Sequence, residues 1–240
     1  MITDAHLHVG DFPMFNVGLA PGALGEHLEA NGISSGIVFS PDNALTAKAV
    51  AATASVCGLV WANPKHPDAV AEARDYLSGP EWRGIKLHPL LDGYLPDDPL
   101  VWPLAELAAG RGLPVLVHCG HPPFSLPWSI EQLAARFPEL TVILGHMGHG
   151  NIVWIDGAIE VAQRRPNVFL ETSGMPMGPK IAEAVCRLGA GRVMYGSDSP
   201  FHDPAVEQFK VARCGLAEEE LAMVMHGTAQ RVFFGTGSAS

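Results

Sequence analysis

Eight apolar segments of strand length alternate with helical patterns along the 240 residues, and this order predicts a single, somewhat distorted (β/α)8 TIM barrel of class α/β. The segments are continuous apolar runs, which is typical of a parallel sheet buried on both faces. The length is close to the roughly 250 residues usual for this fold. A doubly wound open sheet is the main alternative. The strand count argues against it, as does the lack of a glycine-rich phosphate loop after the first strand.

The predicted strands and helices follow in a regular order. The first strand ends in the sequence DAHLH at residues 4–8, and the others are expected at residues 36–40, 58–62, 84–89, 114–118, 141–146, 167–171 and 192–198. Helices are expected at residues 24–30, 44–56, 68–77, 104–109, 130–137, 155–165, 179–188, 205–212, 217–225 and 228–234. Pro89 ends the fourth strand, and Gly189 caps the helix before the eighth. We therefore expect one domain over residues 1–234 and a frayed, small-residue tail at 235–240.

Charge and composition exclude several kinds of partner. The net charge is −10 and no Lys or Arg cluster occurs, so binding to nucleic acid is not expected. The longest apolar runs are of strand length and are interrupted by Gly, Pro or His, so we expect neither a membrane span nor a signal peptide. The four cysteines stand far apart without a CxxC pair; they are Cys57, Cys119, Cys186 and Cys214. Buried thiols in a reducing cytosol fit this pattern better than disulfides, so a cytoplasmic location is expected.

Histidines gather at the predicted carboxyl ends of the strands, where the active site of such a barrel forms. The first strand carries His6 and His8, which share one face because side chains alternate along a strand, with Cα atoms about 6.5 Å apart. The ends of later strands carry Lys86, His88, His118, His146, Glu171 and Asp198. A single strand-end histidine is usually a hydrogen-bonded rim residue. Convergence of five of the eleven histidines on one mouth instead predicts a metal site.

The available donor atoms suit one divalent ion. Neutral imidazoles with one carboxylate favour Zn²⁺, with Mn²⁺, Fe²⁺ or Co²⁺ as alternatives. Three imidazoles and Asp198 leave room for a water molecule, as in a catalytic rather than a structural site. Binding to the ion would lower the pKa of that water towards neutrality. Asp198 could hold the ion, accept the proton of the water, or do both in sequence.

Five motifs in order carry a resemblance to a known family. They are DAHLH at residues 4–8, GIKLHP at 84–89, HCG at 118–120, GHMG at 145–148 and YGSDSP at 195–200. Over nearly its whole length the chain resembles the amidohydrolase superfamily. It is most similar to the amidohydrolase-related (amidohydrolase 2) branch, which holds small metal-dependent hydrolases and some decarboxylases.

The resemblance implies that His6, His8, His118 and Asp198 surround one divalent metal. It makes His146 a further site histidine, either a ligand or the group that polarises the substrate. Thr228 departs from the family pattern, because it replaces the Asn of a common Gly-Asn-Ala segment.

Lys86 has two open interpretations. Larger relatives carry a carbamylated lysine that bridges two metals at the end of the fourth strand. Lys86 lies two residues before His88, with both expected to face inward. A bridging role is one alternative; the other is a lysine buried by its stem and paired with a carboxylate such as Glu171.

Loop residues suggest a small organic substrate with an apolar portion. Lys86, His88, Trp128 and His149 are the expected substrate-binding residues. Other loop candidates are Phe12, Phe15, Asn63, His66, His121, Met175, Met177 and His202. For Met175 and Met177, packing beneath a loop is an equal alternative.

Three functions fit these residues. The first is hydrolysis of a C–O or C–N bond in an ester, lactone or amide by metal-activated water, with Asp198 and His146 as catalytic residues. The second is metal-dependent decarboxylation, in which His146 or Asp198 handles the proton. The third is an inactive barrel that only binds metal or a partner, against which the complete set of site residues argues. No strand-end arginine is present to clamp a carboxylate, which favours hydrolysis. A homodimer is one alternative for the oligomeric state.

Overall fold

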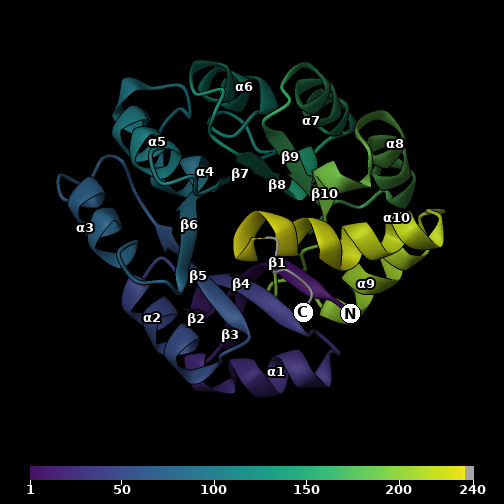
Figure 1. Ribbon diagram of the computed structural model, residues 1–240, viewed down its shortest axis with the longest axis horizontal. Coiled ribbons are helices and arrows are strands. Elements are labelled where there is room, and N and C mark those ends of the chain that lie inside the picture. Colours follow the sequence, from purple (N-terminus) through teal and green to yellow (C-terminus); the bar gives the residue numbers. More distant parts are fainter. Residues whose placement is uncertain (236–240) are drawn as a thin grey trace.

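The computed structural model describes residues 1–235, which form the predicted TIM barrel. Eight parallel strands follow one another in the order β1-β4-β5-β6-β7-β8-β9-β10, and helices surround them (Figure 1). The strands are β1 Thr3–His8, β4 Ser35–Phe39, β5 Val56–Trp61, β6 Trp82–Leu87, β7 Val115–His118, β8 Val142–Gly145, β9 Val168–Glu171 and β10 Val193–Met194. Of the tail expected at 235–240, residues 236–240 lie outside the described part.

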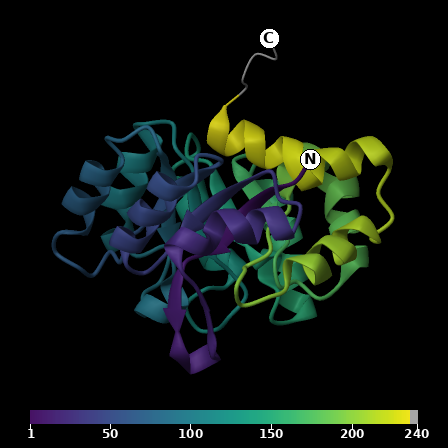
Figure 2. The same ribbon diagram turned by 90° about the horizontal axis from the view of Figure 1, so that it is seen from below.

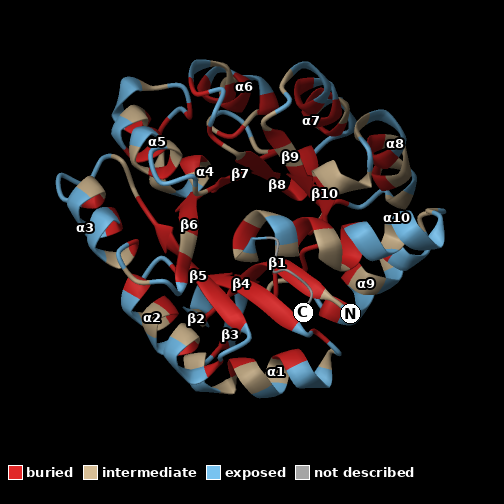
Figure 3. Ribbon diagram, in the orientation of Figure 1, coloured by how far each residue is buried: buried red, intermediate tan, exposed pale blue. Residues whose placement is uncertain are grey.

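Helices fill the connections between the strands. They are α1 Leu24–Ala30, α2 Asn43–Ala52, α3 Ala69–Tyr76, α4 Pro89–Asp92, α5 Trp102–Ala109, α6 Pro127–Arg136, α7 Ile152–Arg164, α8 Gly178–Leu188, α9 Pro204–Ala212 and α10 Glu218–Ala222. Figure 3 shows that the strands are buried and that the outer helices bury the face turned towards them. None of the helices in residues 1–235 is long and apolar enough to cross a membrane.

Backbone hydrogen bonds close the ring between its first and last strands. The amide of Ala5 donates to the carbonyl of Tyr195 at 3.0 Å, and the amide of Asp198 donates to the carbonyl of His6 at 2.8 Å. Further along, the amide of His8 donates to the carbonyl of Ser199 at 2.7 Å. The closure therefore continues beyond the end of β10 and sets Asp198 beside the two histidines of β1.

The carboxyl-terminal segment covers the amino-terminal end of the barrel. Phe233 belongs to the apolar cluster inside the ring, together with residues such as Ile37 and Leu116. Gln230 donates from Nε2 to Thr3 Oγ1 at 3.0 Å and to Ser35 Oγ at 2.7 Å, at the starts of β1 and β4. In Figure 2 this segment lies across one end, and the hairpin of β2 (Gly10–Phe12) and β3 (Val17–Leu19) projects from the other. The open mouth of the barrel is therefore on the hairpin side.

Several predicted boundaries are wrong. The helix expected at 44–56 ends at Ala52, because Thr53 is extended (φ −133°, ψ 99°) and Val56 already begins β5. The strand expected at 192–198 pairs with β9 only at Val193–Met194. The helix expected at 217–225 becomes a π-helix at Met223–Gly227. The sequence does not predict the hairpin, because its strands have only three residues each.

The cysteines are free in the described residues, but they are not all buried. Cys57 and Cys119 lie in the interior, as expected. Cys186 is exposed on α8 and Cys214 is half-buried just after α9, so the prediction of four buried thiols is wrong for these two. Both lie in the outer helical layer, where one side faces solvent.

Candidate metal centre

A cavity of about 690 Å³ occupies the open mouth of the barrel. Buried polar side chains and a rim of apolar ones surround it. The lining residues are His6, His8, Phe12, Phe15, Val17, Pro41, Trp61, Lys86, His88, Leu90, Leu91, His118, His121, His146, Asp198, Phe201 and His202. His6 and Lys86 are fully buried, whereas Phe15 and Leu91 are exposed, so the cavity has a polar floor and an apolar rim.

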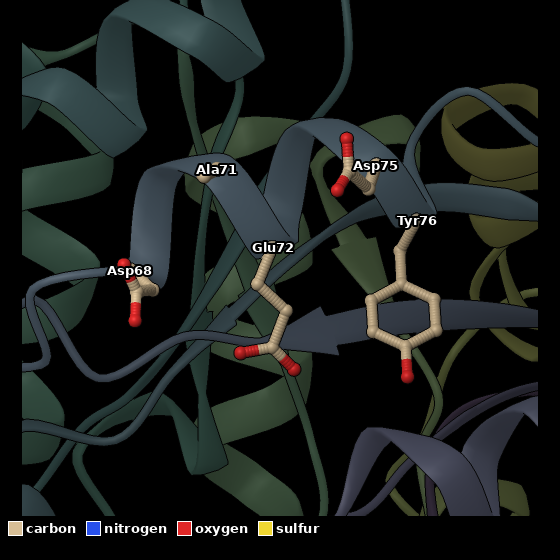
Figure 4. A pocket seen from close by; sticks show the side chains of 5 residues that line it. All are labelled: Asp68, Ala71, Glu72, Asp75 and Tyr76. Atoms are coloured by element: carbon tan, nitrogen blue, oxygen red, sulfur yellow. The ribbon is translucent and has the colours of Figure 1, made fainter.

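A second hollow lies on the outer surface against α3 (Figure 4). It is lined by Asp68, Ala71, Glu72, Asp75 and Tyr76, and its three carboxylates are solvent-exposed. Exposed acidic side chains on one helix face are ordinary solvated surface. This hollow is therefore ordinary surface, and the buried polar side chains lie in the barrel mouth instead.

His6, His8 and Asp198 converge on the floor of the cavity. Asp198 Oδ1 lies 3.0 Å from His8 Nε2 and 3.3 Å from His6 Nε2. The alternation of β1 turns both histidines inward, and the closing hydrogen bond from the amide of Asp198 to His6 brings the carboxylate to them. Asp198 has a φ of 59°, a left-handed conformation that non-glycine residues adopt rarely and often at functional sites.

Glu171 orients the imidazole of His6. His6 Nδ1 donates to Glu171 Oε2 at 2.7 Å, so the Nε2 lone pair is left facing His8 and Asp198. The same carboxylate oxygen accepts from the Ser173 hydroxyl at 2.8 Å and from the backbone amide of His146 at 3.1 Å. A Cβ at Gly196 would lie 2.3 Å from Glu171 Oε1 and 2.8 Å from the Cβ of His6. Only glycine therefore fits between them.

This arrangement fits a divalent transition-metal ion. Burial lowers the pKa values of His6 and His8 well below their usual range, so both imidazoles are neutral and can donate lone pairs. A carboxylate that fixes the tautomer of a metal-ligating histidine is a recurring arrangement around metals, and Glu171 provides it for His6. His8 Nδ1 is buried without a hydrogen-bond partner among the described residues. The residues that would hold the ion are His6, His8 and Asp198, with His118 as the further ligand that the sequence predicts.

His118 lies next to this group rather than within it. Its Nδ1 is 3.0 Å from His146 Nε2, and its other ligand atom clusters with those of His121 and His149. The sequence placed His118 in the same ligand set as His6 and His8, but the potential ligand atoms that lie within 4.8 Å of one another group without it. Its ring stacks on that of His88, with the centroids 4.0 Å apart, and its place among the ligands stays a prediction.

His146 stands between the two groups. Its φ is 64°, and its Nδ1 lies 2.9 Å from Ser173 Oγ. Its ring centroid is 4.6 Å from that of His6, and its Nε2 faces His118. Burial lowers the pKa of His146 well below the usual value, so it is neutral and acts as both a donor and an acceptor. This position at the cavity floor agrees with a substrate-facing role.

Lys86 lies on the floor of the cavity, near the charges of Asp198 and Glu171. Its Nζ is 3.4 Å from His6 Nε2 and 4.8 Å from the ring centroid of Phe39. Among residues 1–235 it makes no ion pair with Glu171, whose oxygens bind His6 and Ser173 instead. Of the two interpretations of Lys86, the one that pairs it with a carboxylate such as Glu171 therefore has no direct ion pair among the described residues. Burial lowers the pKa of Lys86 to about 8 and raises that of Asp198 to about 7.

Of the other three expected substrate-binding residues, one lines the cavity and two do not. His88 lines the cavity and also caps α4, since its Nδ1 accepts from the amide of Leu91 at 3.1 Å. His149 lies behind the wall, with its ring stacked on that of His146 at 4.6 Å. Trp128 does not line the cavity, so this prediction is corrected. It is the second residue of α6 and does not lie in a loop, and it packs so closely on α7 that a Cβ at Gly157 would lie 2.8 Å from its ring.

Among the wider set of loop candidates, Phe12, Phe15, His121 and His202 do line the cavity. Asn63, His66, Met175 and Met177 are absent from the lining. Met175 is fully buried in the layer between sheet and helices, which is the packing alternative weighed for it.

Several residues at or beside the site were not among the sequence candidates, and three of them bear on its chemistry. Trp61 and Phe201 line the cavity, and Ser173 supports Glu171 and His146 from below it. The sequence contains a feature that could have indicated each of them. Trp61 ends an inward-facing strand, Phe201 directly follows the YGSDSP motif, and Ser173 is two residues beyond Glu171.

Comparisons with known proteins assign the family. A model of the Amidohydrolase family (Amidohydro_2) matches residues 4–235. The gamma-resorcylate decarboxylase of Polaromonas sp. (strain JS666 / ATCC BAA-500) is 27% identical over 117 residues, which are 41% of this chain and 35% of that enzyme. The match thus spans about a third of the length of this curated relative.

Solved structures share the fold at lower identity. The 5-carboxyvanillate decarboxylase LigW from Sphingomonas paucimobilis is 19% identical, with a TM-score of 0.74 over 97% of this chain and 98% of that one. A dihydroxybenzoic acid decarboxylase from Polaromonas sp. JS666, solved with bound manganese and the inhibitor 2-nitroresorcinol, is 16% identical, with a TM-score of 0.74 over 98% and 97%. With the family match over nearly its whole length, the chain belongs to the amidohydrolase family, as the motifs predicted.

Proposed function

We propose that this protein is a metal-dependent decarboxylase of a small aromatic carboxylic acid. The observation that carries the proposal is the shape of the cavity: aromatic walls stand over a floor that combines a buried carboxyl, a buried lysine and neutral imidazoles. The decarboxylases among its relatives support the same choice. The absence of a strand-end arginine favoured hydrolysis, but the buried Lys86 supplies a cationic group at the floor.

The walls suit a flat ring. Phe201 contacts Phe12 and Phe15, with ring centroids 4.8 and 5.2 Å apart, and meets His8 edge-on at 5.1 Å. On the other side, Trp61 stacks on His88 at 5.2 Å. Aromatic pairs of this kind offer apolar faces and edges that orient a planar ligand. A benzoic acid derivative fits such a site with its ring at the walls and its polar groups at the floor.

The polar floor would bind the acidic end of the substrate. A divalent ion held by His6, His8 and Asp198 supplies positive charge that stabilises negative oxygen atoms of the substrate. Lys86 adds a positive charge beside them when its amine is protonated, acting as a point charge rather than a two-pronged clamp. The neutral imidazole of His146 can donate a hydrogen bond from the opposite side. These groups together would fix the carboxylate in one orientation.

Asp198 lies where it could transfer the proton that decarboxylation requires. In decarboxylation the bond between the ring carbon and the carboxylate breaks, CO₂ leaves, and the carbon keeps the electron pair and takes up a proton. Asp198 Oδ1 faces the two histidines of β1, whereas Oδ2 faces the half-exposed His202 at 3.7 Å. A proton held at Oδ2 can therefore be delivered to the ring carbon, and His202 connects this oxygen to solvent.

Product analysis separates decarboxylation from hydrolysis. Purified protein loaded with Mn²⁺ or Zn²⁺ would be incubated with hydroxybenzoic acids, including 2,6-dihydroxybenzoate and 5-carboxyvanillate, and in parallel with esters and lactones. We expect release of CO₂ and, in heavy water, one deuterium at the carbon that lost it. Acid release from an ester or lactone, without CO₂ from any aromatic acid, would overturn the proposal in favour of hydrolysis.

A further inference from the structure

The imidazole of His88 is held between two other rings on one wall of the cavity. His88 directly follows β6 and lines the cavity. Its ring stacks on that of Trp61, with the centroids 5.2 Å apart and the planes tilted by 17°. Its other neighbour is the ring of His118, with the centroids 4.0 Å apart and a tilt of 15°. Because the ring is packed on both sides, its edges keep a fixed direction.

The backbone of α4 selects the tautomer of this imidazole. Nδ1 of His88 accepts a hydrogen bond from the amide of Leu91 at 3.1 Å. A backbone amide can only donate, so Nδ1 presents its lone pair to it, which an imidazolium could not do. Burial and the charge of Lys86 act in the same direction, because they lower the pKa of His88 well below its usual value. The single hydrogen of the neutral ring is therefore on Nε2.

The Nε2–H group of His88 can be reached from the cavity and is unpaired within residues 1–235. It is not one of the buried polar atoms that lack a partner, in contrast to Nδ1 of His8. A nitrogen that carries a hydrogen cannot ligate a metal ion, because it has no lone pair to give. His88 accordingly belongs to none of the groups of potential ligand atoms in the described part of the chain. Its Nε2–H is therefore a hydrogen-bond donor for a ligand in the cavity.

Further hydrogen bonds of α4 stabilise this arrangement. The indole Nε1 of Trp61 donates to Asp92 Oδ2 at 3.3 Å, so the same short helix orients both the indole and the imidazole. Lys65 Nζ in turn donates to the carbonyl of Asp92 at 3.0 Å. Side chains that are oriented in this way before a ligand arrives lose little freedom when it binds.

An uncharged donor on the wall suits an oxygen substituent of the substrate ring better than its carboxylate. The carboxylate has stronger partners at the floor, where Lys86 and the ion-binding residues lie. The flat ring would lie along the walls that Trp61 and Phe201 form. The N–H of an imidazole lies in the plane of its ring, so a substituent oxygen at the edge of the substrate ring could accept from His88 Nε2.

We propose that His88 Nε2–H donates a hydrogen bond to an oxygen substituent on the aromatic ring of the substrate and so determines specificity. This inference rests on the proposed function, which supplies the aromatic acid, and it narrows the substrate class to ring-oxygenated benzoic acids. An unsubstituted benzoic acid would cover the donor with an apolar ring edge. The unpaired N–H then costs affinity, which is how a site built to bind a hydroxyl rejects an analogue that lacks it.

Two substitutions separate the two nitrogen atoms of His88. In His88→Asn the amide oxygen can take the place of Nδ1 and accept from the Leu91 amide, as asparagine does at helix starts, but no donor reaches the position of Nε2. In His88→Gln the longer side chain carries an amide donor to that position and gives up the bond to Leu91. His66→Asn is the matched control. His66 is exposed and outside the cavity lining, and its Nδ1 also accepts from a backbone amide, that of Asp68 at 3.4 Å.

Equilibrium binding measures what the donor contributes. The Mn²⁺-loaded proteins would be titrated in a calorimeter with benzoate and with 2-, 3- and 4-hydroxybenzoate, and thermal unfolding curves would verify that each variant is folded. The measured quantity is the ratio of the Kd for benzoate to the Kd for each hydroxybenzoate. For at least one isomer this ratio should exceed one in the wild type and fall about three- to tenfold in His88→Asn, the scale of one neutral hydrogen bond. It should recover in His88→Gln and stay unchanged in His66→Asn.

Nitrogen-15 NMR of histidine-labelled protein checks the donor itself. The signals of His88, assigned by their absence from His88→Asn, should show a hydrogen on Nε2 and none on Nδ1. A hydrogen on Nδ1 would overturn the proposal. So would a wild-type chain that binds none of the hydroxybenzoates more tightly than benzoate, an unchanged ratio in His88→Asn, or a loss there that His88→Gln does not recover. Because the measured quantity is binding, a chain that shows the expected ratios but releases no CO₂ would count against the proposed reaction alone.

Discussion

Replacing Asp198 by Asn is expected to lower turnover at least about a thousandfold while leaving the barrel folded. The amide keeps the shape of the carboxyl but can neither hold the proton at Oδ2 nor offer a negative oxygen to the ion beside His6 and His8. Loss of a general acid–base group alone costs about 10²–10⁴-fold, and weaker metal binding adds to this. The measurement is kcat/KM of the metal-loaded variant beside its thermal unfolding curve.

The neighbouring Asp203 offers a matched control. It is exposed, and its carboxylate caps α9 by accepting from the amide of Ala205 at 2.8 Å. Asparagine caps helices about as well as aspartate, so Asp203→Asn should retain wild-type activity and stability. Wild-type turnover in Asp198→Asn would remove Asp198 from the proposed chemistry.

The double variant His6→Gln, His8→Gln should abolish activity and lose the bound metal ion. The two imidazoles provide the nitrogen donors there, and a glutamine amide is a much poorer ligand for a borderline divalent ion. Glu171 would also lose the hydrogen bond that it accepts from His6 Nδ1, although its bonds from Ser173 and the His146 amide remain. The checks are metal content after dialysis against a limiting amount of Mn²⁺, and turnover with and without added metal.

An undiminished manganese content in that variant would mean that other residues hold the ion. Manganese suits this test because carboxylate oxygen is among its preferred donors, and the group of His6, His8 and Asp198 contains one. Unfolding curves of the two proteins separate loss of binding from loss of structure.

The sequence predicted the barrel and the floor of its cavity for a simple reason. Carboxyl ends of parallel strands meet at one mouth, and the period of two along β1 fixes which side chains face inward. That geometry is local to each strand, so His6, His8 and Lys86 could be placed without knowing any loop. The prediction that placed Asp198 at the mouth assumed a strand that continues to residue 198. The strand ends at Met194, and a left-handed turn beyond it delivers the carboxylate.

Loop-dependent features could not be predicted in the same way. Trp128 stands in a polar, proline-rich stretch that resembles a loop, yet Pro127 begins α6 and turns the indole towards α7. The division of the histidines into two groups depends on the path of the loops that carry His121 and His149. Those loops are set by long-range contacts such as the close approach of Gly148 to Trp154, which no local pattern records.

Anomalous diffraction from crystals of the protein grown with Mn²⁺ tests the central claim most directly. A difference map calculated from data at the manganese absorption edge should contain a peak enclosed by His6 Nε2, His8 Nε2 and Asp198 Oδ1. A well-ordered floor with no anomalous peak between these three atoms, in crystals whose protein retains catalytic activity, would contradict the account.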